Sequence, residues 1–485
     1  MSANRRTVIM KNLLQMSAVA ACVLSLSACL TVGSEYEPPE TEVYQDSWIA
    51  GELAVLAPGE VPRSDWWTSF DDALLTALIE DARARNPSID EAAANVANAQ
   101  AALGAARAAR LPMGALNASV VRQKQSAASL GANVPFEFEA QTLYSAGSEL
   151  SWQADLFGRT ANSIAQADAA LGGREAIAAD AARAILAETA RAYLTLRELD
   201  ARILVNDSNV ERQEDVLALT VRLREAGEVA DIDVERQTNL VQTTKAAISA
   251  LKAARAQTVT GLARLTGRTL PDFYEAYPAL QPGGTETLDA VQAFGPIEIG
   301  EPKDLLRRRP DIRAAERQLA AATYRVGIET ADLYPSLKVS GQANYQAGEV
   351  GELFSADALG YNFGPRLSWG IFNLPLTRAQ IEQAEADVEA ARANFEGTVL
   401  DALTEADAAL LAYNYAVEET AFRTGAFNAA KRARDLTEIR YREGAESLLS
   451  LIDAQRQTLS AEDAEIQARY EALRRRVGIY AAFGG

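Results

Sequence analysis

The side chains that most often carry out catalysis or bind metals are almost missing from this 485-residue chain. It contains no histidine, two cysteines and four methionines, and after residue 28 only Cys29 and Met113 remain of these three types. Histidine and cysteine are common bases and nucleophiles, and imidazole, thiolate and thioether groups are common ligands of transition metals. A glycine-rich phosphate-binding motif is absent as well. We therefore expect no enzyme, no metal site and no cofactor.

The amino-terminal residues have the pattern of a secretory signal peptide. Three basic residues come before an apolar run from Leu13 to Leu26, which is too short to cross a bilayer as a stable helix. We expect residues 1–28 to be removed from the mature protein.

Cys29 is the only cysteine that remains after this signal. Leu26-Ser27-Ala28-Cys29 resembles a bacterial lipobox, which implies that Cys29 becomes the first mature residue and carries covalent lipid such as palmitate. Cys22 would leave with the signal, so no disulfide partner remains. Leu30 follows in place of an aspartate, and by similarity to other lipoproteins this implies an outer-membrane destination.

The charge of the chain argues against nucleic acid as a partner. Asp and Glu total 66 against 47 Lys and Arg, a net charge of −19. Three of the basic residues belong to the signal, so the remainder is more acidic still. Protein surfaces that bind nucleic acid are usually basic.

Two stretches in the second half alternate apolar and polar residues with period two, which predicts strands at about 337–346 and 361–371. Leu367 falls on the apolar side and Ser368 on the polar side. Weaker alternation predicts a matching pair at about 115–123 and 143–153. A membrane β-barrel shows this pattern, with aromatic residues near the ends of the apolar face and polar groups inward. A hairpin of a soluble sandwich fits the local pattern equally well.

Two proline-free stretches with apolar residues at spacings of three and four predict very long helices, from about 160 to 225 and from about 377 to 442. Each would be roughly 100 Å long. Taken alone, their periodicity also fits a structural periplasmic coiled-coil rod.

The chain is internally duplicated. Asn86-Pro87 matches Arg309-Pro310, and other glycine, proline, tryptophan and aspartate landmarks recur in the same order at offsets of 217 to 223. We assign repeat 1 to residues 65–267 and repeat 2 to 306–485. A proline-containing extended leader covers 29–64, and prolines and glycines predict an irregular connector over 268–305.

Four strands per chain cannot close a membrane barrel. An open sheet edge in hydrocarbon leaves backbone groups without partners, and about eight strands form the smallest useful barrel. If the strands enter the membrane, several chains must share one barrel.

The sequence resembles the TolC-like outer-membrane efflux channels, and most closely their lipoprotein branch (OprM/NodT-like), over essentially all of residues 29–485. The motifs that carry the resemblance are the lipobox, Tyr36–Pro39, Asp65-Trp66-Trp67, Phe70-Asp71-Asp72, Asn86-Pro87, Asp155-Leu156-Phe157-Gly158-Arg159, Arg308-Arg309-Pro310-Asp311, Tyr441-Arg442-x-Gly444 and Leu451-Ile452-Asp453-Ala454-Gln455-Arg456. The resemblance implies a mixed α and β membrane protein. It would be a homotrimer, with a periplasmic α-helical barrel continuous with a 12-stranded outer-membrane β-barrel.

The function implied by this resemblance is the outer-membrane exit duct of a tripartite efflux pump. The duct would export small molecules such as drugs, with a periplasmic adaptor protein and an inner-membrane pump of the resistance-nodulation-division type as partners. A type I protein-secretion channel of the same fold is the alternative. The sequence does not identify the exported substrate.

Acidic residues gather where each long helix is expected to reverse, near Gly227 and Gly444. Asp233 and Asp453 match between the repeats at an offset of 220, and we expect them to ring the periplasmic entrance. The resemblance places Leu449 and Asp453 at the narrowest point of a closed channel. It places Tyr441 among contacts that hold the mouth shut, and Arg456 lies one turn beyond Asp453. Gly227 and Gly444 mark the turns expected to contact the adaptor.

Overall fold

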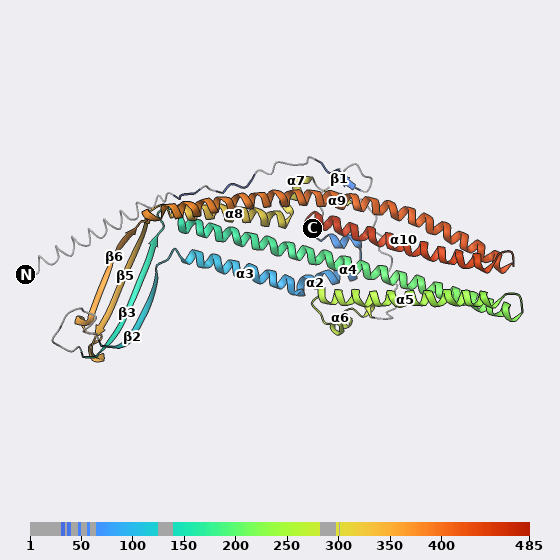
Figure 1. The fold of residues 1–485 in the computed structure, drawn as a ribbon, viewed down its shortest axis with the longest axis horizontal. Helices are drawn as coiled ribbons and strands as arrows, with labels where there is room; N and C mark the ends of the chain where they lie inside the picture. The colour runs from blue at the N-terminus through green and yellow to red at the C-terminus, as the bar shows by residue number, and fades with distance from the viewer. Residues whose placement is uncertain are drawn as a thin grey trace, which may run out of the picture. The chain divides into compact units, whose positions relative to one another are not determined.

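The computed structural model describes residues 31–33, 36–39, 47–49, 56–58, 65–124, 139–281, 297–299 and 301–485 (Figure 1). The chain divides into two compact units, and each unit combines stretches that are far apart in sequence. The first unit comprises Met1–Pro39, Val96–Arg174 and Ala315–Phe395. The second comprises Glu40–Asn95, Glu175–Ala314 and Glu396–Gly485. Both units therefore draw on both halves of the duplicated sequence.

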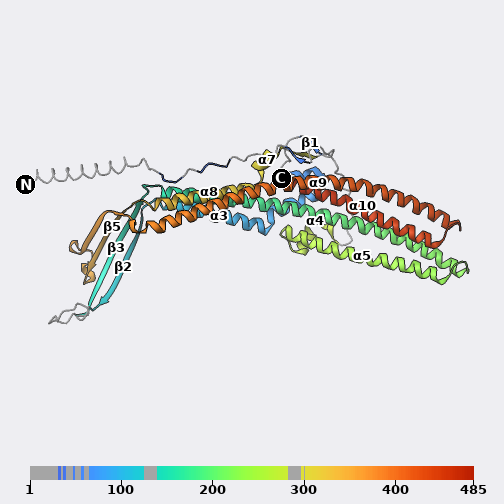
Figure 2. The same ribbon diagram turned by 45° about the horizontal axis from the view of Figure 1, so that its top comes forward.

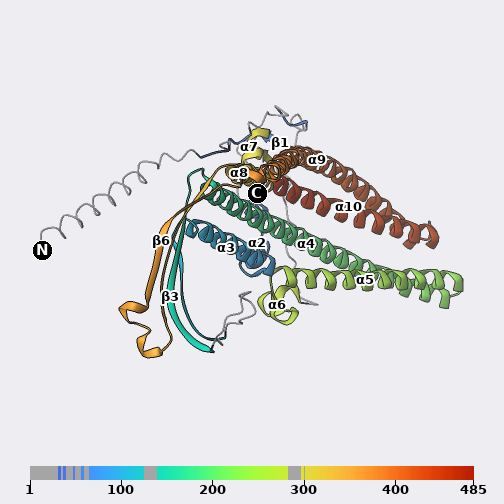
Figure 3. The ribbon, with the colours of Figure 1, turned by 60° about the vertical axis from the view of Figure 1, so that its left-hand side comes forward.

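The first unit contains a four-stranded antiparallel sheet in the order β2-β3-β5-β6, which forms a single curved layer (Figure 3). The strands are β2 (Met113–Gln123), β3 (Gln141–Ala154), β5 (Ser336–Ala347) and β6 (Leu359–Ser368). The first three contain the ranges expected from sequence. The limits expected for the fourth strand, 361–371, were wrong at its end.

The chain leaves the sheet after Ser368 because it turns toward the next helix. One turn of 3₁₀-helix, η7 (Ile371–Asn373), follows, and the Asn373 amide donates to the Gly370 carbonyl at 2.8 Å. The Trp369 indole donates to the Leu333 carbonyl at 3.0 Å. Trp369 and Ile371 therefore continue the alternation in sequence without belonging to the strand.

Long helices make up most of the rest of the chain (Figures 1 and 2). The helices α4 (Arg159–Glu225) and α9 (Leu374–Arg442) have 67 and 69 residues, close to the expected limits. They are followed by α5 (Asp231–Leu265) and α10 (Leu448–Ala482), each of 35 residues. Two 22-residue helices, α3 (Pro87–Ala108) and α8 (Pro310–Ala331), precede the two strand pairs.

The duplication is visible in equivalent hydrogen bonds. In repeat 1 the Asn86 side chain donates to the Leu265 carbonyl at 2.8 Å, and in repeat 2 Arg309 donates to the Ala482 carbonyl at 2.9 Å. In the sheet, the Trp152 indole donates to the Arg110 carbonyl at 2.9 Å, as Trp369 does to Leu333. The starts of α3 and α8 are thus fastened in equivalent ways in the two repeats, and so is the chain at the ends of β3 and β6.

The segment between the repeats is more regular than its prolines and glycines predict. It contains α6 (Leu270–Ala276), η4 (Pro278–Leu280) and β4 (Ile297–Ile299), and α7 (Pro302–Arg308) begins before residue 306. Proline is favoured in the first turn of a helix, where its missing amide hydrogen is not needed. Pro271, Pro278 and Pro302 all occupy such positions. These prolines therefore begin helices.

The leader is likewise not wholly irregular. Its residues Leu56–Pro58 form β1, which pairs in parallel with β4. Leu56–Pro58 of the leader and Ile297–Ile299 of the connector thus form a small two-stranded sheet within the second unit.

The core of the second unit includes a short helix that follows a pair of tryptophans. Trp66, in η2 (Trp66–Phe70), stacks on Tyr480 at 5.1 Å between ring centroids. Leu75, Leu78 and Ile79 of α2 (Ala73–Arg85) are fully buried. These aromatic and aliphatic side chains account for much of the burial that stabilises this unit.

Candidate functional site

The four strands place most of their large apolar side chains on one face of the sheet. Residues directly opposite each other in an antiparallel pair point to the same side, so the register assigns every strand residue to a face. Phe363, Gly341 and Leu150 form one such row. We call this side the apolar face; its larger members are Leu116, Val120, Tyr144, Leu150, Trp152, Leu337, Val339, Tyr345, Leu359, Tyr361, Phe363, Pro365 and Leu367. Tyr361 is 82% exposed and Phe363 73% exposed, so other parts of the chain do not cover them.

The opposite side of the sheet, which we call the polar face, carries mainly small or hydrophilic side chains. Its polar members are Asn117, Ser119, Gln123, Gln141, Ser145, Glu149, Ser151, Gln153, Ser336, Lys338, Ser340, Gln342, Asn344, Gln346, Asn362, Arg366 and Ser368. Met113, Val121 and Leu143 are the large apolar residues on this side. Ser119 and Ser145 share a hydrogen bond of 2.7 Å across this face. Leu367 and Ser368 lie on opposite faces, as the alternation predicts.

Aromatic residues of the apolar face gather toward the two ends of the strands. Trp152 lies at the end where the strands meet the helices, and Tyr144, Tyr345 and Tyr361 lie toward the hairpin end. Membrane β-barrels have this arrangement, with aromatic girdles on either side of an apolar band. A soluble sheet would instead bury such a face against another layer.

The two outer strands of the sheet, β2 and β6, each have one free edge. Among the described residues neither β2 nor β6 has a second partner strand. An exposed edge of this kind is a template for pairing with another chain.

In the second unit, each pair of helices reverses through a glycine with positive φ, 82° at Gly227 and 73° at Gly444. The Gly227 amide donates to Arg224 at 3.0 Å and the Glu228 amide to Leu223 at 2.9 Å. The corresponding bonds at Gly444 and Ala445 are 3.0 and 2.8 Å. Glycine takes this left-handed conformation at no steric cost. Both turns have open space around them.

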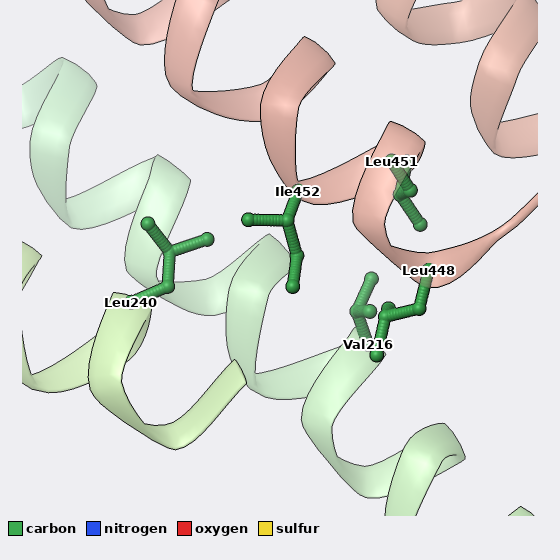
Figure 4. Packing of buried hydrophobic residues seen from close by; sticks show 5 residues of the cluster. All are labelled: Val216, Leu240, Leu448, Leu451 and Ile452. Carbon is green, nitrogen blue, oxygen red and sulfur yellow. The ribbon is translucent and has the colours of Figure 1, made fainter. Parts of the chain in front are cut away.

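A small apolar cluster joins three helices behind these turns. Figure 4 shows Val216 of α4, Leu240 of α5, and Leu448, Leu451 and Ile452 of α10 pointing toward one another. Tyr441 of α9 packs against the cluster, and its buried hydroxyl has no hydrogen-bond partner in the described part of the chain. The cluster therefore fixes the start of α10 against α4 and α5.

The residues expected to form the gate lie at the exposed edge of this cluster. Leu449 is 58% exposed, whereas its neighbour Leu448 is 6% exposed. Asp453 and Arg456 line an open hollow with Gln457 of α10 and Arg423 of α9. Gln457 donates to the Asp453 carboxylate at 2.8 Å, and Arg236 forms an ion pair with Asp233 at 3.6 Å. Each acid is thus held by a residue of its own helix.

The structure does not place Asp233 and Asp453 at equivalent positions. The helix α10 begins 217 residues after α5, so Asp233 is the third residue of its helix and Asp453 the sixth of its own. Burial agrees with this offset, because Gln237 is buried and Gln457, its match at an offset of 220, is exposed. The offset of 220 was therefore wrong. At 1.5 Å per residue, Asp233 lies about 3 Å and Asp453 about 7–8 Å from the start of its own helix.

Other expected features can be placed only in part. Cys29 and the signal lie outside the described residues. Within the described ranges, no cluster of acidic or cysteine residues could hold a metal ion. The described helices include none with an apolar stretch sufficient for a membrane span.

Sequence reasoning missed two features of this site. Val216 and Leu240 come from helices whose apolar residues are spaced regularly throughout, so nothing in sequence marks these two as partners of α10. Lys338 and Arg366 lie directly opposite each other on the polar face. Their pairing depends on the register of β5 with β6, which the residues between the strands determine.

Comparisons with known proteins agree with this geometry. The family model described as "Outer membrane efflux protein" matches residues 78–268 and 302–485. Nodulation protein T of Rhizobium leguminosarum bv. viciae is 31% identical over 453 residues, covering 92% of this chain and 88% of that protein. The pyoverdine export outer membrane protein OpmQ of Pseudomonas aeruginosa is 29% identical over 483 residues, covering 98% and 97%.

A solved structure shares the fold along nearly the whole chain. The outer-membrane channel OprN superposes with a TM-score of 0.83 at 33% identity, covering 94% of this chain and 99% of OprN. The chain therefore belongs to the outer membrane efflux protein family and is the outer-membrane component of an efflux pump.

Proposed function

We propose that three copies of this chain form one continuous exit duct, with the sheets in the outer membrane and the long helices in the periplasm. The observation that carries this proposal is the four-stranded sheet with one apolar face, one polar face and two unpaired edges. Neither edge can remain open in hydrocarbon, where each unpaired backbone group costs several kcal/mol.

The strand directions allow the sheet to close by repetition. All three pairings within the sheet are antiparallel, so β2 and β6 run in opposite directions. The β6 edge of one copy can therefore pair in antiparallel fashion with the β2 edge of the next. Three copies give twelve strands, enough for a water-filled lumen lined by the polar face.

The entrance to the duct would be controlled at the helix turns. Three copies bring Leu449, Asp453, Arg456, Asp233 and Tyr441 to one mouth, with the two acids at slightly different levels. Like charges in such a ring repel, and Arg236, Arg456 or bound cations offset that repulsion. Opening requires the α9–α10 hairpin to move away from Val216 of α4 and Leu240 of α5.

The partners of the duct would be a periplasmic adaptor and an inner-membrane pump of the resistance-nodulation-division type. The turns at Gly227 and Gly444 are the sites we assign to the adaptor. Their exposure and their open surroundings support this assignment.

Cys29 would attach the mature chain to the outer membrane through covalent lipid. Acyl chains add affinity, while a closed barrel is the stronger anchor. Mass spectrometry of the mature N-terminal peptide tests this assignment, and an unmodified Cys29 or cleavage at another bond refutes it.

The cargo would be small molecules, with type I protein secretion as the competing function. The relative OpmQ is named for pyoverdine export, which supports the first. The test is deletion of the gene in its host, followed by measurement of accumulated fluorescent dye and of protein in the medium. Dye accumulation that the wild-type gene reverses supports small-molecule export. Loss of one secreted protein with unchanged dye content contradicts it.

A further inference from the structure

The polar face of the sheet carries two basic side chains in direct opposition. Lys338 of β5 pairs with Arg366 of β6, and both side chains are exposed. Side chains directly opposite in an antiparallel pair have Cβ atoms about 4.5–5.5 Å apart, and like charges there are destabilising. Neither side chain forms an ion pair within the described residues. The pair is therefore an uncompensated positive charge.

No acid of the neighbouring strand rows neutralises this pair, and the nearest acid along the chain, Asp155 just beyond β3, already accepts hydrogen bonds from the Thr160 and Ala161 amides. The third residue of the pair's row is Gln153, and the neighbouring rows hold Ser336 with Ser368, and Ser340 with Ser151. Glu149 is the sole acid of the polar face in the described strands, and it lies four residues from Gln153 along β3. That separation is about 13 Å, which is longer than the screening length of about 8 Å at physiological ionic strength.

The charge of the polar face is opposite in sign to the net charge of the whole chain. The chain carries a net charge of −19, yet this face has two basic residues and one acidic residue. In a trimer the pair would be repeated three times around the lumen. Six positive charges would then lie at the end of the barrel nearest the helices.

We propose that Lys338 and Arg366 form a cationic collar that binds anionic groups of solutes passing through the duct. This inference rests on the trimeric barrel proposed above. Arginine presents a planar fork that binds carboxylate or phosphate through two hydrogen bonds, and lysine adds a compact charge beside it. The ligand class is a small organic molecule with carboxylate, sulfate or phosphate groups.

The test uses the full-length purified protein in planar bilayers, with inositol hexakisphosphate added on the sheet side. We expect this hexa-anion to block the wild-type pore. The double variant Lys338→Gln/Arg366→Gln should raise the blocking concentration by about tenfold or more, and its reversal potential in a KCl gradient should shift toward potassium selectivity.

The control is Arg122→Gln/Lys124→Gln, which removes the same formal charge at the hairpin end of the sheet, where Arg122 lies on the apolar face and Lys124 follows the end of β2. Inositol hexakisphosphate should block this variant at the same concentration as it blocks the wild type. Equal block of both double variants, with normal pores, overturns the collar and leaves the trimeric duct standing. Folded protein that forms no pores even when Leu449→Ala is added to widen the entrance overturns the duct, and the collar with it.

Discussion

At the scale of single residues, buried charges are tolerated where they fasten the ends of helices. The Arg309 side chain is 5% exposed and lies 2.7 Å from carboxylate oxygens of both Asp311 and Glu405. It also donates to the Ala482 carbonyl. One guanidinium therefore joins the start of α8 to α9 and to the end of α10. Removing one member of such a buried group is costly because the other charges lose their partner.

The pKa of Asp311 gives this group a pH dependence. Burial acts to raise the pKa of Asp311, but the hydrogen bonds and positive charge of Arg309 outweigh it and hold the pKa below its usual 3.8. Because the folded-state pKa is lowered, the stabilisation is present above pH 3.8 and is lost as the pH falls through the folded-state value.

We predict that Asp311→Asn lowers the free energy of unfolding by about 1–3 kcal/mol at pH 7. The difference from the wild type should begin to shrink as the pH falls below 3.8, where the carboxyl of the unfolded chain is protonated first, and should vanish below the folded-state pKa. Thermal melts of the detergent-solubilised protein at pH 7 and pH 3 measure it. Asp231→Asn, which removes an exposed ion pair with Arg224, is the control and should change stability little. An equal loss at both pH values would contradict the assignment.

At the scale of elements, helix limits were readable from sequence and contacts between elements were not. Glycine and proline mark the ends of α4, α5, α9 and α10, and their effects are local. The end of β6 was misjudged because Trp369 and Ile371 keep the alternation while the chain has already turned. Alternation records which residues could share a face, whereas a strand also needs a partner to pair with.

At the expected gate, too, contacts between helices could not be predicted from the sequence. Arg236-Gln237-Thr238 and Arg456-Gln457-Thr458 are identical in sequence but occupy different faces of their helices, since Gln237 is buried and Gln457 is exposed. Helix phase is set by where the preceding turn ends and by packing against Val216 and Leu240. Neither can be read from a three-residue match.

Neighbouring leucines at the start of α10 separate the gate from the core. We predict that Leu448→Ala costs about 2–5 kcal/mol, because it opens a cavity in the buried cluster. Leu449→Ala should cost much less because that side chain is exposed, yet it should raise the conductance of the closed pore. Thermal melts and single-channel recordings of both variants measure the two effects. A large stability loss in Leu449→Ala, with unchanged conductance, would show that Leu449 is a core residue.

At the scale of the whole molecule, the sheet has two unpaired edges. Its apolar face is suited to lipid and its polar face to water. Alternation in the sequence predicted the two faces of β3, β5 and β6, because alternation is a local property, whereas β2 carries Val121 on the polar face and Arg122 on the apolar face. Alternation did not locate the bilayer midplane. Leu367 is the next-to-last residue of β6, so Phe363, which lies in a row with Leu150, is closer to the middle of the apolar face.

Phe363 and Asn362 are therefore the matched pair for testing the faces. We predict that Phe363→Arg costs about 2–4 kcal/mol at each of three positions around the barrel and sharply reduces the amount of protein in the outer membrane. Asn362→Arg, one residue away on the polar face, should insert normally. Immunoblots of fractionated membranes measure both. Equal insertion of the two variants would mean that Phe363 does not face lipid.

In the proposed barrel, β6 of one copy pairs with β2 of the next, and three such pairings close the ring. Cysteines on the polar face test it, with Asn117→Cys combined in turn with Gly360→Cys, Asn362→Cys and Gly364→Cys in a Cys22→Ala/Cys29→Ser background. Within one chain β2 and β6 are separated by two strands, about 14 Å, which is too far for a disulfide. Any cross-link therefore joins two copies.

Oxidised membranes are then examined on a non-reducing gel. We predict that at least one of these pairs gives cross-linked dimers and trimers and no larger species, and that Asn117→Cys with Phe363→Cys, on opposite faces, gives none. A ladder that continues beyond three copies, or only monomers for every pair in protein that has reached the membrane, would contradict this prediction.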